Sequence, residues 1–191
     1  WLLSAAIRRG IGSLFHVSWW THSMDPSFEL AKQGAIHAIV GTLEIGLLTS
    51  IISVPIALLT AIFLVEYARG TKIAKAISFA VDVLTGVPSI VAALFVFAVV
   101  VTTFGGAQSA WASSLALMIL MIPTVLRSTE EMLKLVPDSL REASFALGVS
   151  KWKTIMRVVL PTSMTGILTG IVLGLARVMG ETAPLIVLVQ F

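Results

Sequence analysis

The sequence predicts an all-α protein that crosses a membrane several times. Hydrophobic residues make up 57% of the 191 residues and charged residues only 12%, against roughly 45–50% and about 25% in an ordinary soluble domain. Four long apolar segments follow one another, and most Lys and Arg residues gather beside them rather than within them. This excess of apolar side chains is more than a soluble core can bury. The net charge is +3, and its positive residues cluster at the ends of the apolar segments, as they do in membrane proteins whose cytosolic loops are rich in Lys and Arg. This charge therefore does not indicate nucleic-acid binding.

Residues 1–35 precede the long apolar segments. Their apolar start, residues 1–7, is far shorter than the roughly 20 residues that a membrane-spanning helix needs. We therefore expect the end of a truncated first helix, followed by an external loop in which Trp19 and Trp20 form an aromatic anchor. No metal site is expected, because the sequence has no Cys and its histidines lack close ligand spacing. The histidines, expected to be solvated or interfacial, are His16, His22 and His37.

A transmembrane domain is predicted over residues 36–191. Four segments are apolar and long enough to span a bilayer, and the second and the fourth are each interrupted by a short Gly- and Pro-containing stretch. The predicted spans are residues 36–65, 77–104, 107–126 and 162–191. We expect the interruptions, at residues 86–89 and 180–184, to break or kink the helices.

The distribution of Lys and Arg predicts the orientation of these spans. Residues 69–75 and 127–157 are basic, whereas the turn at Gly105 and Gly106 carries no charge. Because cytosolic loops are enriched in Lys and Arg, the two basic segments are expected in the cytosol and the turn outside. Residues 10–37 are then external as well.

Residues 137–161 form an amphipathic segment between the third and fourth spans. Ser139 and Glu142 have the spacing of a capping box at a helix start, and Gly148 stands where a left-handed residue would end that helix. Ser150 is expected to cap a second short helix that ends before Pro161. The pattern therefore predicts two short cytosolic helices that a partner protein could bind.

Three glycines recur at every fourth residue of the fourth span, at Gly166, Gly170 and Gly174. Small residues at this spacing let another helix approach closely. Glycine is also common in membrane helices in general. We expect this face of the span to be a helix–helix contact.

Arg177 and Glu181 are charged residues deep in the fourth span, one helical turn apart. A charge near the centre of a bilayer costs roughly 3 kcal/mol or more, so such residues are candidates for a polar pathway. An arginine suits an oxyanion because it keeps its proton and its fork matches phosphate oxygens. A structural ion pair near the outer interface is the alternative.

Asp82, Arg127 and Thr182 complete the candidate pathway residues. Asp82 precedes Gly86 by four residues, so it could face the same cavity as the break or lie at the interface. Arg127 follows the third span, where a positively charged cytosolic anchor is the alternative. The sequence lacks nucleotide-binding, metalloprotease and hydrolase motifs. We therefore expect a transport subunit rather than an enzyme, with any ATP bound by another chain.

The segment from Glu142 to Pro161 resembles the EAA loop of ABC importer permeases. The family pattern is Glu-Ala-Ala, three residues, Gly, nine residues, Ile-x-Leu-Pro; here Ser144 replaces the second Ala and Val158 the Ile. In that family the loop docks into a cleft of a cytosolic ATPase, which implies the same role for residues 137–161. The coupling residues implied by this resemblance are Arg141, Glu142, Ala143, Gly148 and Lys151.

Further phrases resemble the phosphate importer permeases of the Pst system, and the PstA type in particular. They lie at residues 41–43, 81–90, 127–131 and 176–185. The resemblance implies a type I ABC importer permease bundle in the bacterial inner membrane, with six helices in the intact chain and four near-complete ones here. It also implies inorganic phosphate as the substrate.

The partners implied by the resemblance are a homologous PstC-like permease, a dimer of a PstB-like ATPase, a PstS-like phosphate-binding protein outside the cytoplasm, and the lipid bilayer. ATP and magnesium would then bind to the ATPase, and this chain would hold no cofactor. Two alternatives stay open. One is an ABC importer permease for another small oxyanion. The other is an ATP-independent secondary transporter or membrane enzyme that uses Arg177 and Glu181 as a proton relay.

Overall fold

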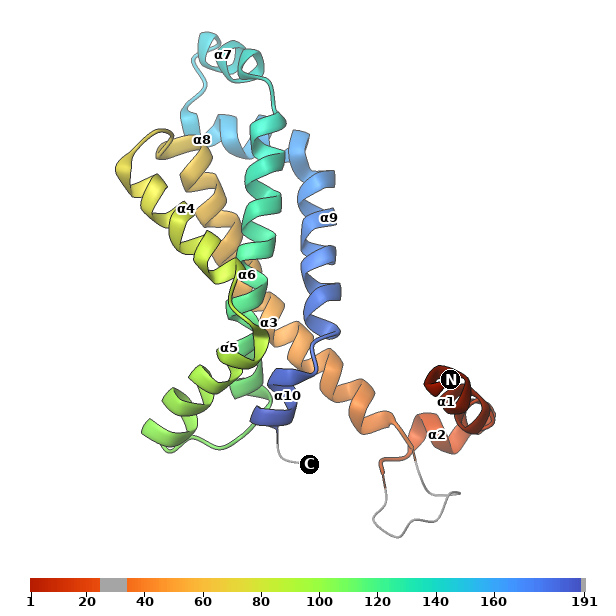
Figure 1. Ribbon diagram of the computed structural model, residues 1–191. Coiled ribbons are helices and arrows are strands. Elements are labelled where there is room, and N and C mark those ends of the chain that lie inside the picture. Colours follow the sequence, from red (N-terminus) through yellow and green to blue (C-terminus); the bar gives the residue numbers. More distant parts are fainter. Residues whose placement is uncertain (25–33, 190–191) are drawn as a thin grey trace. The chain divides into compact units, whose positions relative to one another are not determined.

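The computed structural model describes residues 1–24 and 34–189. Every regular element in these two ranges is a helix, as the composition predicts (Figure 1). The chain divides into two compact units, residues 1–44 and 45–191. The candidate residues of the substrate pathway and residues 137–161, called the coupling loop from here on, all belong to the second unit.

The first unit contains α1 (Leu2–Gly10), the 3₁₀ turn η1 (Ser13–Phe15), α2 (Val17–Thr21) and the start of α3. The indole Nε1 of Trp20 donates to the Leu14 carbonyl at 3.0 Å, and the Ala35 amide donates to the Trp19 carbonyl at 2.8 Å. The aromatic segment is therefore partly helical rather than only a loop. Residues 25–33 of the expected external loop lie outside the described residues.

The three histidines of the first unit have exposed side chains. Thr21 Oγ1 lies 2.9 Å from His22 Nδ1, and the Met24 amide donates to His37 Nδ1 at 3.4 Å. In the part of the chain that the structure describes, no group of three or more potential ligands could hold a metal ion.

α3 (Ile36–Ile62) continues into the π-helical turn η3 (Phe63–Tyr67), and together they form a 32-residue apolar helix. Pro55 lies inside this helix without ending it. The helix matches the predicted first span at its start and extends two residues beyond its predicted end.

The second predicted span is sharply bent. α4 (Lys72–Thr85) is followed by α5 (Ser89–Val96) and the π-helical turn η4 (Phe97–Thr103), and the two arms differ in direction by 102°. The break falls at the predicted interruption because Pro88 has no amide to donate and disfavours a helical residue before it. α4 begins five residues earlier than predicted, where the Thr71 hydroxyl caps it by accepting from the Ala74 amide at 3.2 Å.

The third span, α6 (Ala110–Leu135), is nine residues longer at its end than predicted. Ser109 caps its start by accepting from the Ala112 amide at 3.4 Å. The prediction stopped at the first charge, but the helix carries Arg127, Glu130 and Lys134 on further turns where their charges pair.

After α7 (Asp138–Ala146), the chain forms α8 (Lys151–Thr154), the π-helical turn η5 (Ile155–Val159) and α9 (Leu160–Met179). The last three are one continuous helix of 29 residues. The expected end before Pro161 was therefore wrong. A proline at the beginning of α9 follows the wider π turn, and such local adjustments let membrane helices continue through proline.

The fourth span breaks at the predicted interruption: α9 ends at Met179 with Gly180 as its cap, and α10 (Ala183–Leu188) follows as a separate helix. Residues 190–191 of the predicted span lie outside the described residues. Leu188 is fully buried in a small cluster with Ala93 and Ala116, so α10 packs against α5 and α6. The Gln108 side-chain amide donates to the Val187 carbonyl at 2.9 Å and holds this segment in place.

The core of the second unit lies between α3, α6 and α9. Leu117, Met121 and Val125 follow one another along α6 with 2% exposure or less. The glycines of α9 face the same helix: a Cβ at Gly170 would collide with Ser128, and one at Gly166 with Met132. A Cβ at Gly174 would lie 2.9 Å from Val125. The close approach of α6 and α9 thus depends on the small residues of this face.

Three helices are long and apolar enough to cross a membrane, and the bent pair α4–α5 brings the number to four if it counts as one span. These counts refer to the two described ranges. The second unit therefore belongs to a multi-pass membrane protein.

Candidate functional site

Arg177 lies in the last turn of α9, with an exposed side chain. Its Nη1 donates to Thr124 Oγ1 on α6 at 3.3 Å, and the Thr124 hydroxyl donates onward to the Leu120 carbonyl at 3.2 Å. Within the described residues the guanidinium makes no second hydrogen bond. Arg177 therefore presents further N–H donors at the end of an apolar helix.

Among the described residues Glu181 forms no ion pair with Arg177, whose one side-chain hydrogen bond goes to Thr124. The expected i, i+4 relationship fails because α9 ends at Met179 and Gly180 forms its cap. Glu181 is half-buried beyond the helix, and its amide donates to the Val178 carbonyl at 3.1 Å. Thr182 follows as the exposed first residue of the turn into α10.

Arg127 and Asp82 are brought together across two helices. Arg127 Nη2 lies 2.5 Å from Asp82 Oδ1 and also donates to the Ser78 carbonyl at 3.0 Å, while Nη1 donates to Glu130 Oε2 at 2.7 Å. The guanidinium thus ties α4 to α6. Because it is engaged by two carboxylates, Arg127 is less open to a passing anion than Arg177.

Glu130 was missing from the predicted site. Its side chain is 9% exposed and lies between Arg127 and Lys134, whose Nζ donates to Oε1 at 2.7 Å. Glu130 follows Arg127 by three residues and precedes Lys134 by four, and side chains at these spacings meet on one face of a helix. The sequence therefore contained a signal that could have identified Glu130. Asp82, Arg127, Glu130 and Lys134 form a chain of alternating charge.

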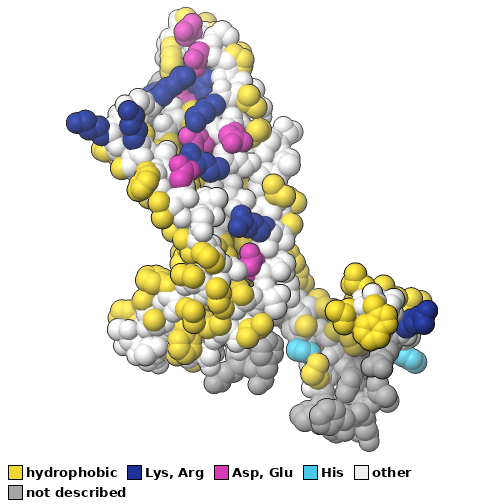
Figure 2. All heavy atoms as spheres, viewed as in Figure 1, with side chains coloured by type: hydrophobic (Ala, Val, Ile, Leu, Met, Phe, Trp, Pro, Cys, Tyr) yellow, Lys and Arg dark blue, Asp and Glu magenta, His cyan; other side chains and the backbone are white. Residues whose placement is uncertain are grey.

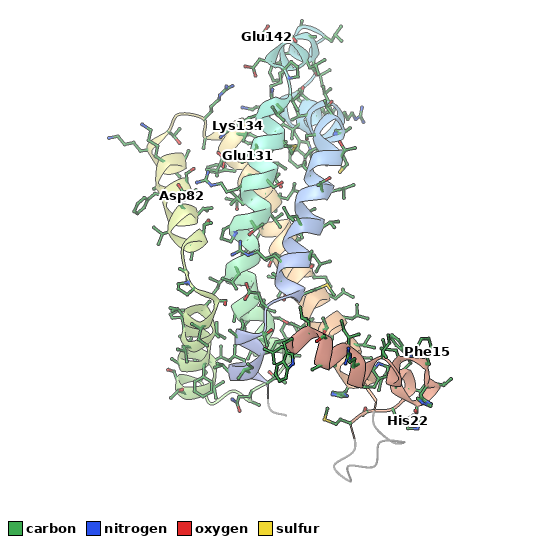
Figure 3. All side chains as sticks on the ribbon, turned by 45° about the vertical axis from the view of Figure 1, so that its right-hand side comes forward. Phe15, His22, Asp82, Glu131, Lys134 and Glu142 are labelled. Atoms are coloured by element: carbon green, nitrogen blue, oxygen red, sulfur yellow. The ribbon has the colours of Figure 1, made fainter. Side chains whose placement is uncertain are left out.

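Charged side chains follow one another along one face of the second unit, over α7, α4 and α6, and hydrophobic side chains predominate over α5 (Figure 2). Figure 3 labels Asp82 on α4, and Glu131 and Lys134 on α6, along this face. The charged face thus runs between the coupling loop and the middle of the unit.

The turn after α7 confirms the conformation predicted for Gly148, whose φ is +76°. The Gly148 amide donates to the Phe145 carbonyl at 2.9 Å and the Val149 amide to the Ser144 carbonyl at 3.2 Å. These two bonds form a Schellman motif, which closes the end of the helix. The two halves of the loop are joined by Ser144 Oγ and Thr154 Oγ1, 2.8 Å apart and buried.

The predicted capping box is wrong. α7 starts one residue before Ser139, with Pro137 at the cap position and no side-chain cap bond. Ser150 does occupy the cap position of α8, but its side chain makes no cap bond either. The expected boundary at Ser150 is therefore right, and the expected capping hydrogen bonds are not formed.

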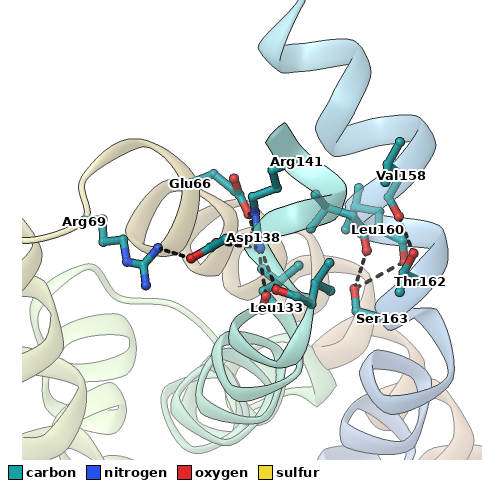
Figure 4. Close-up of polar contacts among 11 residues, drawn as sticks. Glu66, Arg69, Leu133, Asp138, Arg141, Val158, Leu160, Thr162 and Ser163 are labelled. Carbon is teal, nitrogen blue, oxygen red and sulfur yellow. Dashed lines mark hydrogen bonds and ion pairs between the residues drawn. The ribbon is translucent and has the colours of Figure 1, made fainter. Parts of the chain in front are cut away.

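The predicted coupling residues divide into two groups. Glu142, Ala143, Gly148 and Lys151 are exposed, and Lys151 Nζ lies 4.7 Å from the centre of the Tyr67 ring. Arg141 points inward instead: its side chain is 12% exposed and forms an ion pair with Glu66 (Figure 4). The Arg141 guanidinium is therefore held at the end of α6 and differs from the other four predicted coupling residues, which are exposed.

The model of the family described as "Binding-protein-dependent transport system inner membrane component" matches residues 53–190. The chain is 53% identical over 192 residues to the phosphate transport system permease protein PstA 1 of Mycobacterium tuberculosis (strain ATCC 25618 / H37Rv), covering 100% of this chain and 62% of that protein. PstA of Yersinia pestis is 42% identical over 186 residues, covering 97% and 62%.

A solved structure titled as an inward-facing MetNI methionine ABC transporter has the same fold, with a TM-score of 0.70. The two chains are 22% identical, and the match covers 78% of this chain and 72% of the MetNI transporter chain. The chain spans about 62% of the length of the two curated relatives. The match over residues 53–190, which includes α6, the loop and α9, places this chain in the family of binding-protein-dependent transport system inner membrane components.

Proposed function

We propose that the chain is a permease subunit of an ATP-driven importer of inorganic phosphate. The structural observation that carries the proposal is Arg177, a guanidinium with unengaged donors at the end of an apolar helix, held by Thr124 of α6. Charged residues in membrane-spanning helices usually face the bundle interior or a water-filled cavity, and the bond to Thr124 turns this guanidinium toward α6. The names of the PstA relatives support phosphate as the anion.

In this proposal the chain forms half of the translocation path. Phosphate oxygens accept from the fork of Arg177, which keeps its charge at every physiological pH. Glu181 and Thr182, which follow in the turn after α9, line the same part of the path. Asp82 and Arg127 act at its border by holding α4 against α6.

Coupling is assigned to the exposed side of α7 and the turn at Gly148. Glu142, Ala143 and Lys151 are exposed there, and Leu147 is 84% exposed. An apolar side chain presented beside charges suits a docking surface. The partner is an ATPase dimer similar to PstB, which binds ATP and magnesium, so this chain hydrolyses nothing and needs no cofactor of its own.

The remaining partners are a homologous PstC-like permease, which supplies the other half of the path, and a PstS-like phosphate-binding protein outside the cytoplasm. The assembly belongs to the bacterial inner membrane. A proton relay through Arg177 and Glu181 has less support, because the two side chains do not form an ion pair within the described structure. Transport of another small oxyanion is the alternative that the same arginine could serve.

The test is uptake of labelled phosphate by the four-component complex in liposomes, with and without ATP and with sulfate as competitor. Uptake that needs ATP and resists excess sulfate supports the proposal. Uptake that is independent of ATP supports a secondary transporter. Preferential uptake of sulfate would assign the site to another oxyanion.

A further inference from the structure

The end of α3 is joined to the coupling loop by an ion pair between Glu66 and Arg141. Glu66 lies in η3, and its Oε1 accepts from Arg141 Nη2 at 2.7 Å and from Nε at 3.1 Å (Figure 4). The two residues are 75 positions apart in the sequence. One carboxylate oxygen thus receives two N–H donors of the same guanidinium, which fixes the orientation of Arg141.

The same guanidinium closes the end of α6. Arg141 Nη2 donates to the Leu133 carbonyl at 3.0 Å, and Nη1 donates to the Val136 carbonyl at 2.6 Å. Carbonyls at the end of a helix have no partner within the helix, so a side chain that reaches them replaces water. Arg141 therefore connects three elements: η3, the end of α6 and α7.

Both charges are largely removed from solvent, since the side chain of Glu66 is 7% exposed and that of Arg141 is 12% exposed. Removing one member of such a pair leaves the other charge without compensation, which is far more harmful than losing an exposed pair. Asp138 offers a contrast: it also contacts Arg141 Nη1, at 3.1 Å, but it is 60% exposed and belongs to α7 itself.

A second contact from η3 reaches the other half of the loop. The ring of Tyr67 lies under Lys151 Nζ, 4.7 Å away, which is a cation–π distance. The buried hydroxyl pair Ser144 and Thr154 joins the two halves to each other. Neighbouring residues of one π-helical turn therefore hold both sides of the coupling loop.

We propose that Glu66 is a positioning residue for energy coupling: through Arg141 it fixes α7 to the end of α3, so that a displacement of α7 moves α3 and α6 with it. The inference rests on the proposed function, because it requires an ATPase that acts on α7. In this inference η3 is the element through which the coupling loop contacts the transmembrane helices.

The variant Glu66→Gln keeps the size of the side chain and removes its charge, and Asp138→Asn is the matched control. Both variants take one carboxylate from Arg141. Asp138→Asn also removes a contact with Arg69, 3.6 Å away, but both of those side chains are exposed and such a pair contributes little, whereas Glu66→Gln removes the buried pair that holds α7 against η3. In the reconstituted complex, phosphate imported per ATP hydrolysed is expected to fall roughly tenfold in Glu66→Gln and to stay at the parent ratio in Asp138→Asn. Hydrogen exchange of α7 amides should rise only in Glu66→Gln.

Parent-like import per ATP in Glu66→Gln overturns the inference, and so does an equal loss in the two variants. If Glu66→Gln does not accumulate in membranes, Glu66→Asp replaces it, with a shorter but charged side chain and an expected smaller loss. A parent complex that imports no phosphate contradicts the proposed function instead. In that case hydrogen exchange alone tests whether Glu66 links α7 to the end of α3, and unchanged exchange of the α7 amides in Glu66→Gln overturns the inference.

Discussion

The guanidinium of Arg127 on α6 lies 2.5 Å from the carboxylate of Asp82 on α4, close to the point where α4 and α5 part at 102°. This contact, with the Arg127 bond to the Ser78 carbonyl, holds the first arm of the bent pair against α6. Glu130 supports it from the same helix.

Substitutions in this pair are expected to differ in severity. Asp82 is 65% exposed, so Asp82→Asn should lower the free energy of unfolding by only about 0–1 kcal/mol. Arg127→Gln also deprives the buried carboxylate of Glu130 of a donor and should cost about 1–3 kcal/mol. Thermal unfolding of the purified protein in detergent measures both. An equal or larger effect of Asp82→Asn would show that the α4 contact, not Glu130, sets the stability.

Replacement of Arg177 is expected to remove transport without removing the protein. Arg177→Gln should abolish phosphate uptake, and Arg177→Lys should retain part of it, because a point charge replaces a bidentate fork. Lys75→Gln, which removes one exposed positive charge from α4 outside the coupling loop, is the matched control. Uptake is measured in membranes with equal subunit levels. Parent-rate uptake by Arg177→Gln would place the path elsewhere.

Substitutions of Gly148 test the left-handed turn after α7. A Cβ there would meet no atom within 4 Å, so the cost arises from the backbone alone. We expect a loss of about 1–2 kcal/mol for Gly148→Ala, less for Gly148→Asn and more for Gly148→Val. Gly41→Ala, in an open position without positive φ, is the control. Protease sensitivity of the loop and uptake per ATP should follow this order, and equal effects of Asn and Val would contradict it.

Gly170 tests the contact between α6 and α9. Gly170→Ala places a Cβ against the Ser128 side chain and is expected to destabilise the protein by about 1–3 kcal/mol. The second substitution Ser128→Gly should recover much of this loss, because it vacates the space that the new methyl group needs. Thermal unfolding of the single and double variants measures the recovery. Independent, additive effects would rule out a direct contact at this position.

The orientation can be tested with single cysteines, since these 191 residues contain none. A cysteine at Lys151 should react with an impermeant thiol reagent only after the cells are opened, whereas one at Ala107 should react in intact cells. Labelling at Lys151 in intact cells would reverse the predicted orientation.

Local patterns in the sequence were sufficient for features that depend on neighbouring residues. Gly148 adopts the left-handed conformation because a helix end needs it within a few residues, and the bend before Pro88 depends on the proline itself. The start of the first span at residue 36 follows from apolar composition alone.

Features that depend on distant partners could not be predicted in the same way. The burial of Arg141 requires Glu66, 75 residues away, and nothing in its immediate sequence distinguishes it from an exposed loop arginine. The break at residues 180–184 was predicted from the local Gly and Pro, but the direction that α10 takes after it depends on packing against α5 and α6. The spacing of Arg177 and Glu181 would have made a pair only in an unbroken helix.

The bend between α4 and α5 has a consequence for biogenesis. At about 1.5 Å per residue, the 14 residues of α4 extend about 21 Å, which is less than the roughly 30 Å of a bilayer's hydrocarbon core. The second arm, Ser89–Thr103, is of similar length, so neither arm alone is long enough to span the bilayer as a helix. Because Arg127 of α6 follows Asp82 in the sequence, the arm that contains Asp82 is synthesised before its ionic partner, and its contact with α6 forms only after α6 has been made.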